Sequence, residues 1–326
     1  MTTTATPTAS APATPQTRSQ WQLFRRRFFR HRLAMLGLII IIGLFVICFG
    51  ARWIAPYRRN GIDLGSPASG NGGSGGRSGN GGLLDDLLRR QDSSGQGTGP
   101  SKAHWFGTDV LGRDYLTEIL YAGQISLKVG LAVAVLSTSF GTALGSLAGY
   151  FGKAVDQTIS RVIDLFLIVP SIALLAVAIQ KLGQSDTTVI LALAGLGWMT
   201  VARVVRGQAY ALREREFVDA ARIAGASGRR IIFRHLLPNM IGPVMVAATF
   251  NMAAAIVAES TLSFLGYGIQ PPKTSWGNML SAAEEFAGTS KAYLLYFPGL
   301  LILLTVLAAN FLGDGLRDAF DPQARR

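Results

Sequence analysis

The sequence predicts an all-α membrane protein with about six transmembrane helices. Of its 326 residues 49% are hydrophobic and only 15% are charged, and the mean hydropathy is +0.32, a balance that is unusual for a water-soluble chain. A helix needs roughly 20 apolar residues to cross about 30 Å of hydrocarbon. Four uncharged runs are long enough, and two shorter runs with polar ends bring the count to six: 33–51, 129–152, 236–258 and 292–313, then 165–180 and 187–202.

The N-terminal part divides into a tail and an anchor. Residues 1–20 are rich in Thr, Ala, Pro and Ser, which predicts a disordered tail. Residues 21–52 are predicted to be the first transmembrane helix with a basic cytoplasmic flank. A cleaved signal peptide is the alternative, but the apolar core is longer than a typical signal core and no clean small-x-small site follows it. The flank carries Arg25, Arg26, Arg27, Arg30 and Arg32.

The basic residues also predict the topology. A second basic cluster extends from Arg203 to Arg234, and the positive-inside rule places both clusters in the cytoplasm. With an even number of spans, the N- and C-termini are then both cytoplasmic. By the same parity, residues 53–103, which contain a Gly/Ser-rich stretch, form an extracytoplasmic low-complexity loop. The net charge is +12, and the basic residues cluster next to predicted spans. Membrane lipid is therefore an expected partner, and nucleic acid is not.

Small residues mark the second span and its approach. Gly107 and Gly112 suit a turn and Asp114 suits a helix N-cap. We therefore expect residues 104–130 to lie along the outer membrane surface before the chain enters the membrane. Gly141, Gly145 and Gly149 recur at every fourth residue, the small-xxx-small pattern that lets two membrane helices approach closely.

Catalytic groups are scarce. His31, His104 and His235 are too scattered for a metal site, and the sequence has no paired-cysteine spacing and no phosphate-binding G-x-x-x-x-G-K-[ST] loop. We therefore predict a non-catalytic membrane subunit with no cofactor, whose energy comes from another chain. A secondary carrier is disfavoured because internal repeats and mid-membrane charges are not evident.

The polar segment between the fourth and fifth predicted spans contains a helix with a small-residue face. Good helix formers run from 214 to 224, and Gly225 is placed to end this helix. Ser227 can cap a second helix, and Pro238 suits the first turn of the next span. Ile231, Ile232 and Leu236 are expected to face the bilayer boundary. The small-residue face consists of Phe217, Ala220, Ala221 and Ala224.

This face suits a groove in a partner protein, because small side chains permit close approach. Two other interpretations compete with docking. One is an amphipathic loop held by anionic lipid, and the other is an ordinary solvated connector. Lipid binding would favour bulky apolar residues over alanines.

Four stretches carry a family resemblance. "DAARIAG", followed by Leu237 and Pro238, resembles the coupling motif of ABC importer permeases: Glu-Ala-Ala, three residues, Gly, nine residues, an apolar residue, one more, then Leu-Pro. Asp219 replaces the Glu of the motif, and His235 replaces its apolar residue. Residues 104–127, 258–280 and 298–322 are similar to the C-type permease of the dipeptide, oligopeptide and nickel importers.

The resemblance implies a type I ABC importer permease fold in a multi-pass protein of the bacterial cell membrane, with 104–326 as the permease core and 203–237 as its cytoplasmic coupling loop. It implies a homologous second permease subunit, two cytoplasmic ATPase subunits and an extracytoplasmic solute-binding protein. The substrate would be a di- or oligopeptide, or alternatively nickel or another small solute. The implied coupling residues are Glu216, Phe217, Asp219, Ala220, Ala221, Gly225, Ala226, Ser227, Leu237 and Pro238.

The candidate pathway residue is Glu259, because ionisable groups inside a membrane are costly. Near the outer end of its span, it would meet the ammonium group of a peptide. The alternative is a carboxylate held by a neighbouring loop or by water. Residues 266–279 suit an ordered outer loop or a re-entrant gate. This segment either contacts the binding protein or is anchored at the membrane interface by Trp276.

Overall fold

A computed structural model describes residues 20–57 and 97–320, and every extended regular element in these ranges is a helix. The predicted all-α class is therefore confirmed. The predicted tail, apart from Gln20, and most of the predicted loop 53–103 lie outside the described residues. The helices are α1 Gln20–Arg30, α2 Arg32–Phe49, α3 Ala51–Ile54, α5 Tyr115–Phe151, α6 Lys153–Ile168, α7 Ser171–Leu182, α8 Asp186–Arg213, α9 Glu216–Ile223, α10 Gly228–Ile231, α11 Leu237–Phe264, α12 Trp276–Ala282 and α13 Tyr293–Phe320, with a π turn at Ile232–Leu236 and a 3₁₀ turn at Glu284–Phe286.

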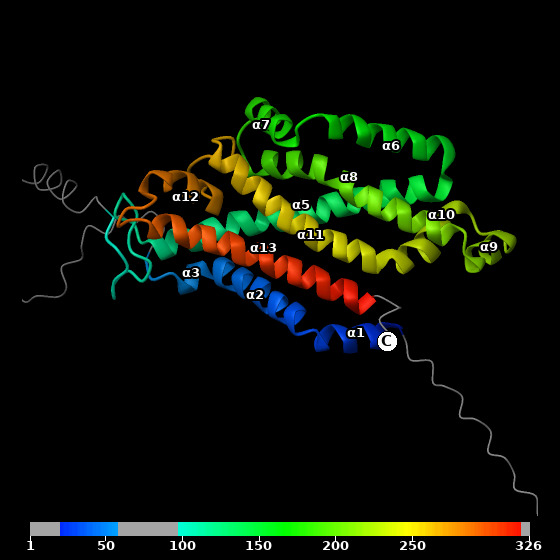
Figure 1. The fold of residues 1–326 in the computed structure, drawn as a ribbon, viewed down its shortest axis with the longest axis horizontal. Helices are drawn as coiled ribbons and strands as arrows, with labels where there is room; N and C mark the ends of the chain where they lie inside the picture. Colours follow the sequence, from blue (N-terminus) through cyan, green and yellow to red (C-terminus); the bar gives the residue numbers. More distant parts are fainter. Residues whose placement is uncertain (1–19, 58–96, 321–326) are drawn as a thin grey trace, which may run out of the picture.

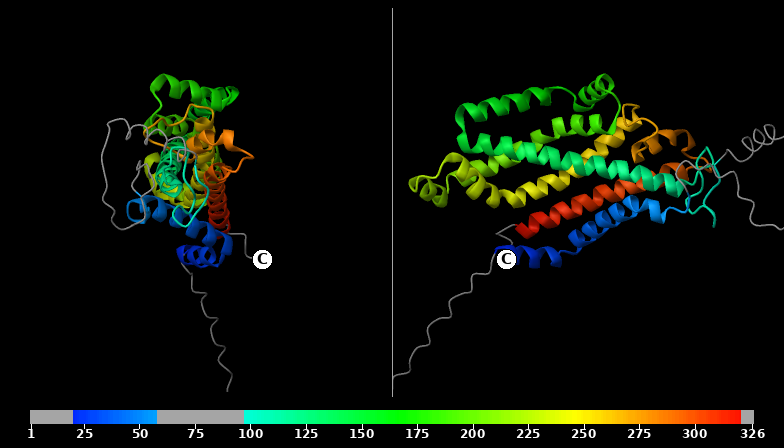
Figure 2. Two further views of the ribbon diagram at one scale, coloured as in Figure 1. Left: turned by 90° about the vertical axis from the view of Figure 1, so that its left-hand side faces the viewer. Right: turned by 180° about the vertical axis from the view of Figure 1, so that it is seen from behind.

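The long helices form an elongated bundle whose two ends differ (Figures 1 and 2). Helices α2, α5, α8, α11 and α13 run lengthwise. At one end lie α9, α10, α1 and the last turn of α13, and we call it the α9 end. At the other lie α12 and the turn segment 97–114, and we call it the α12 end. Helices α9 and α10 and both ends of the described chain therefore lie at the same end of the bundle.

Five helices are long and apolar enough to cross a membrane, namely α2, α5, α8, α11 with its preceding turns, and α13. A sixth crossing exists only if α6 and α7 count as one span, and the two are bent by 88°. The predicted span at 165–180 is therefore not one continuous helix, because it contains the break between α6 and α7. Pro170 lacks an N–H and disfavours the helical conformation at Val169, which is extended with φ −86° and ψ 133°.

The second span begins earlier than predicted. Asp114 caps α5 by accepting a hydrogen bond from the backbone N–H of Thr117 at 2.9 Å. From Tyr115 the helix continues without a break for 37 residues, or about 56 Å at 1.5 Å per residue. Residues 115–130 are thus the first part of the same continuous helix and not a separate segment. Hydropathy predicted a later start for this helix because residues 115–130 include polar side chains, which are buried in the bundle.

The glycine stripe on α5 packs against α8, as predicted. A Cβ atom on Gly145 would lie 2.6 Å from the carbonyl oxygen of Ala202, and one on Gly141 would lie 2.6 Å from that of Trp198. Only glycine permits this approach of two helix backbones. The α5–α8 pair is therefore closely packed along this stripe.

The basic flank is a separate helix. His31, with φ −82° and ψ 98°, interrupts the chain between α1 and α2 and caps α2 by accepting from the N–H of Ala34 at 3.1 Å. Helix α1 lies against the last turn of α13, where the rings of Phe24 and Phe320 stack with centroids 4.2 Å apart. The arginines of this helix are thus held at the α9 end.

Candidate functional site

The coupling segment is the part of the predicted coupling loop that joins α8 to α11, residues 214–236, and it projects from the α9 end (Figure 1). Its first helix, α9, spans Glu216–Ile223 and is shorter than the predicted 214–224. The predicted first residue, Glu214, instead caps α8 and accepts from the guanidinium of Arg213 at 2.8 Å. Within α9, Glu216 and Asp219 lie in the first turn, where carboxylates interact favourably with the helix dipole.

Helix α9 ends in a glycine cap of the Schellman type. The N–H of Ala226 donates to the carbonyl of Ala221 at 3.0 Å, and the N–H of Gly225 donates to that of Arg222 at 2.9 Å. Gly225 has φ +77°, the left-handed conformation that this motif requires and that glycine adopts without a Cβ penalty. The predicted end of the helix at Gly225 is confirmed.

The inward face of α9 differs from the prediction. Val218 is fully buried, and Ala221 and Ala226 pack beside it. Ala221 therefore faces the bundle and does not belong to the exposed face. The surrounding cluster also contains Ile231, Ile232 and Leu236, so the expectation that these three side chains face the bilayer boundary is wrong.

The outward face of α9 carries exposed apolar groups. Phe217 is 40% exposed and Ile223 is 89% exposed, while Ala220 also lies on the surface. A Cβ atom on Gly225 would have no atom within 4 Å. Ile223 was not among the predicted site residues, although a β-branched apolar residue beside charged neighbours was a usable signal. Exposed apolar side chains at a loop tip are typical of a docking surface.

Tyr150, near the end of α5, anchors the segment. Its carbonyl accepts from Arg213 at 3.3 Å, and the guanidinium of Arg222 lies 5.8 Å from its ring centroid. Arg222 also pairs with Asp219 at 2.8 Å. A Cβ atom on Gly228 would lie 3.1 Å from the ring of Tyr150. The coupling segment is therefore held to the ends of both α5 and α8.

The segment continues into the membrane as one helical rod. Ser227 caps α10 by accepting from the N–H of Arg230 at a long 3.5 Å. Helix α10 passes through the π turn into α11, so that 228–264 is helical throughout. Pro238 lies in the first turn of α11, after Leu237. Pro238 has no N–H to donate to the carbonyl of Arg234. The π turn Ile232–Leu236 lies directly before Pro238, and such a turn accommodates the missing hydrogen bond.

Two ion pairs join α8 to α6. Arg206 donates to Asp156 at 2.8 Å, and Arg203 donates to Asp164 at 3.1 Å. Arg203 and Arg206 were predicted only as basic-cluster residues. Pairing with a carboxylate lowers the cost of holding an arginine near a membrane boundary.

Glu259 lies within α11 near the α12 end and has no exposed surface. One of its carboxylate oxygens accepts from the hydroxyl of Ser263 at 2.8 Å, and the hydroxyls of Ser263 and Ser275 are 3.4 Å apart. Its other oxygen has no hydrogen-bond partner among the described residues. The contacts of Glu259 thus lead to the loop after α11 and not to an open surface.

Trp276 begins α12 and is fully buried. Its indole N–H donates to the carbonyl of Ile119 at 3.0 Å, and its backbone N–H donates to the hydroxyl of Ser126 at 3.1 Å. Interfacial anchoring requires an exposed ring, so the predicted anchoring by Trp276 is wrong. The residue instead fastens the loop to α5. The predicted outer loop is ordered and ends in this short helix.

Known proteins match the chain along most of its length. Residues 141–326 match the family described as binding-protein-dependent transport system inner membrane component, and residues 19–68 match the N-terminal transmembrane domain of oligopeptide transport permease C. The oligopeptide transport system permease protein OppC of Mycobacterium tuberculosis is 38% identical over 94% of this chain and 96% of the relative.

Three further matches are two named relatives and one solved structure. The dipeptide transport system permease protein DppC of Alkalihalophilus pseudofirmus is 37% identical over 94% of this chain and 91% of its own length. The glutathione transport system permease protein GsiD of Escherichia coli is 37% identical over 95% and 93%. An inward-facing structure of the MetNI methionine ABC transporter aligns with a TM-score of 0.52 and 19% identity, covering 63% of this chain and 96% of the matched chain.

Proposed function

The chain belongs to the inner membrane components of binding-protein-dependent transport systems, and from this membership we propose that it forms half of the pathway through which an ATP-driven importer moves peptides. It is a multi-pass membrane protein with the permease fold of ABC importers. A homologous permease subunit would supply the other half of the pathway. Two ATPase subunits would supply the energy, and a solute-binding protein would deliver the peptide.

The exposed face of α9 carries this proposal. Phe217, Ala220 and Ile223 are free to enter a groove of an ATPase subunit, while Val218 fixes the opposite face to the bundle. The helical rod from 228 to 264 leads from this contact into the membrane. When the ATPase subunits close on ATP, movement of α9 would tilt α11, because a rigid segment transmits motion that a loose turn absorbs.

The orientation follows from the same proposal. The α9 end would face the cytoplasm, with both termini, and the α12 end would face the solute-binding protein. The arginines of α1 and of the coupling segment collect at the α9 end, as the positive-inside rule requires of short cytoplasmic loops.

The proposal of a peptide substrate is based on the relatives, whose names specify oligopeptide, dipeptide and glutathione transport. Nickel or another small solute of the same importer class is the alternative. We expect a tagged chain to co-purify with two ATPase subunits and a second permease. Vesicles containing this complex and its binding protein should accumulate a radiolabelled dipeptide, and unlabelled peptide should compete. Accumulation of nickel in place of peptide would overturn the substrate assignment.

For Glu259 we propose that the carboxylate holds the outer loop and does not line the pathway. Glu259→Gln keeps an oxygen that accepts from Ser263, so we expect peptide affinity and uptake within about twofold of wild type. Glu259→Leu leaves a buried hydroxyl unpaired and should lower the thermal stability of the complex. Loss of uptake by the glutamine variant at unchanged stability would instead give the carboxylate a pathway role.

A further inference from the structure

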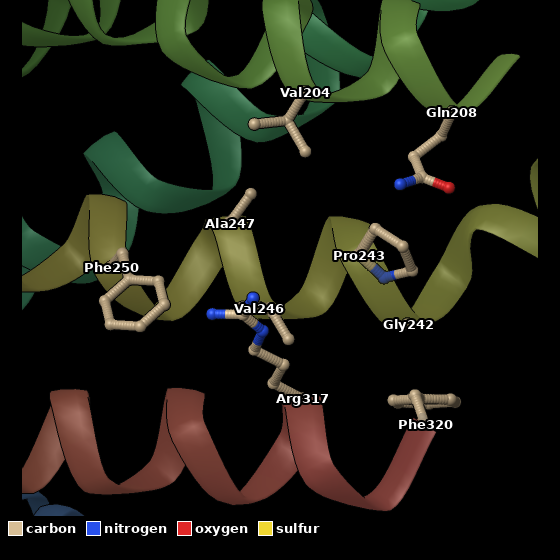
Figure 3. A pocket seen from close by; sticks show the side chains of 9 residues that line it. All are labelled: Val204, Gln208, Gly242, Pro243, Val246, Ala247, Phe250, Arg317 and Phe320. Carbon is tan, nitrogen blue, oxygen red and sulfur yellow. The ribbon is translucent and has the colours of Figure 1, made fainter. Parts of the chain in front are cut away.

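A groove follows the exposed face of α11 between α8 and α13, towards the α9 end, and we call it the α11 groove (Figure 3). Its volume is about 550 Å³, within the range of pockets that bind small molecules. Residues of α8 form one wall, residues of α13 the other, and α11 forms the floor. The lining residues are Val204, Gln208, Gly242, Pro243, Val246, Ala247, Phe250, Arg317 and Phe320.

The groove contains polar groups that a lipid-facing surface would not carry without cost. Figure 3 shows the guanidinium of Arg317 reaching from α13 over Val246, and the amide of Gln208 pointing in from α8. Within the part of the chain that the structure describes, Arg317 makes no ion pair or hydrogen bond. Arg203 and Arg206 are both paired with aspartates. Arg317 is exposed in the last turn of α13, and an arginine without a protein partner beside transmembrane helices belongs in water or opposite an anion.

The floor of the groove is also interrupted. Pro243 lies inside α11 and cannot donate a hydrogen bond to the carbonyl of Asn239, one turn earlier. Backbone irregularities at membrane depth are tolerated where they are buried in protein or line a water-filled cavity. Gly242, beside it, packs against the ring of Phe320, and Gly242 and Pro243 both line the groove.

We propose that the α11 groove is the water-filled inner section of the peptide pathway in this chain, and that Arg317 receives the C-terminal carboxylate of the passing peptide. This inference rests on the proposed function. A guanidinium binds a carboxylate through two parallel hydrogen bonds, the amide of Gln208 can bond a peptide group, and Val246 and Phe250 can contact peptide side chains. A phospholipid would satisfy Arg317 with its headgroup, but its acyl chains offer nothing to Gln208.

Thiol labelling tests whether the groove holds water. The only cysteine of this chain, Cys48, is buried, so Cys48→Ala gives a cysteine-free chain into which Val246→Cys is introduced, and labelling is read on this chain alone. The matched control is Leu36→Cys, which is 47% exposed on α2. Gly313 packs against Thr249 and Gly315 packs against Ala34, which places Leu36 at about the depth of the groove. The probe is a charged methanethiosulfonate added to inside-out vesicles that enclose binding protein and dipeptide.

We expect Val246→Cys to react at least about tenfold faster than Leu36→Cys, because thiolates form in water and not in hydrocarbon. ATP-driven passage of the dipeptide should slow the reaction. Equal, slow labelling of both cysteines would overturn the inference, as would protection by added phosphatidylglycerol and not by peptide. Peptide movement by the complex that contains the cysteine-free chain is measured in the same vesicles. If that movement is absent, the proposed function fails. If it is intact and the groove does not label, only this inference fails.

The role of Arg317 has its own comparison. Arg317→Gln removes the charge and should raise the KM for dipeptide passage about tenfold, the range expected for one charge-assisted hydrogen bond. Arg317→Lys keeps the charge but cannot form the two parallel hydrogen bonds, and should recover part of the loss. The stability of the complex should not change in either variant, because Arg317 has no partner among the described residues. An unchanged KM in the glutamine variant would remove Arg317 from the pathway.

Discussion

Replacing Gly225 by leucine is expected to reduce peptide uptake to background while the chain still inserts into the membrane and assembles. Gly225 has φ +77° and ends α9 where nothing lies within 4 Å of its missing side chain. The Cβ atom of a leucine there would meet no atom of the described residues within 4 Å, and the rest of the side chain would project into the space that an ATPase groove is proposed to occupy. Uptake of labelled dipeptide, together with the amount of complex in the membrane, measures both effects.

The matched control separates docking from backbone strain. Gly225→Ala carries the same left-handed strain, roughly 1–2 kcal/mol for a non-glycine residue, but adds little bulk. We expect the alanine variant to retain a substantial part of the uptake that the leucine variant loses. Equal loss in both variants would mean that the glycine shapes the backbone and does not permit close approach. Normal transport by Gly225→Leu would refute docking at this surface.

Replacing Val218 by aspartate should uncouple α9 from the membrane helices. Val218 is fully buried in a cluster that includes Val205 of α8 and Met240 of α11. An unpaired carboxylate there costs about 3–5 kcal/mol, more than a helix of eight residues retains. The helix should detach locally while the spans stay folded. We expect uptake to fall to background, and trypsin to cleave at Arg215 and Arg222 in inside-out vesicles.

Val218→Thr is the control for this variant. Threonine has nearly the same shape as valine, and its hydroxyl can bond a carbonyl one turn earlier, so the cost is about 1–3 kcal/mol. The segment should remain resistant to trypsin and uptake should be partly retained. If Val218→Asp stays protease-resistant and transports peptide, α9 is not fixed through this residue and the rigid connection does not exist.

The positions of the spans could be predicted from the sequence because uncharged length is a property of the chain itself. Four of the six runs correspond to single helices, α2, α5, α11 and α13, and a fifth, 187–202, lies within α8. The sixth run, 165–180, contains the break between α6 and α7. Hydropathy averages over Val169 and Pro170 without registering that they turn the chain by 88°. The polar start of α5 was missed for a related reason, since burial in the bundle removes the need for apolar side chains.

The local chemistry of the coupling segment was also predictable. Gly225 and Ser227 occupy the cap positions that their backbone preferences favour. The choice of inward face was not predictable. Small apolar residues lie on both sides of α9, and only the cluster formed by distant segments shows that Val218 and Ala221 face inward while Phe217 and Ile223 face outward.

Trp276 and Glu259 show the same limit at the α12 end. Each was judged by its residue type, as an interfacial aromatic and as a costly carboxylate. Trp276 is hydrogen-bonded to the carbonyl of Ile119 and to the hydroxyl of Ser126. Glu259 accepts a hydrogen bond from the hydroxyl of Ser263. These partners are separated by as many as 157 positions in the sequence, and no local pattern joins them.

Photo-crosslinking from α9 tests the central claim most directly. A benzophenone amino acid replaces Ile223, which is 89% exposed at the α9 end, and in a second variant replaces Trp53, which is 85% exposed near the α12 end. In membranes that contain the whole importer, irradiation should join position 223 to an ATPase subunit and should not do so from position 53. Crosslinking of position 223 to lipid alone, or to the solute-binding protein, would contradict the coupling role of this surface.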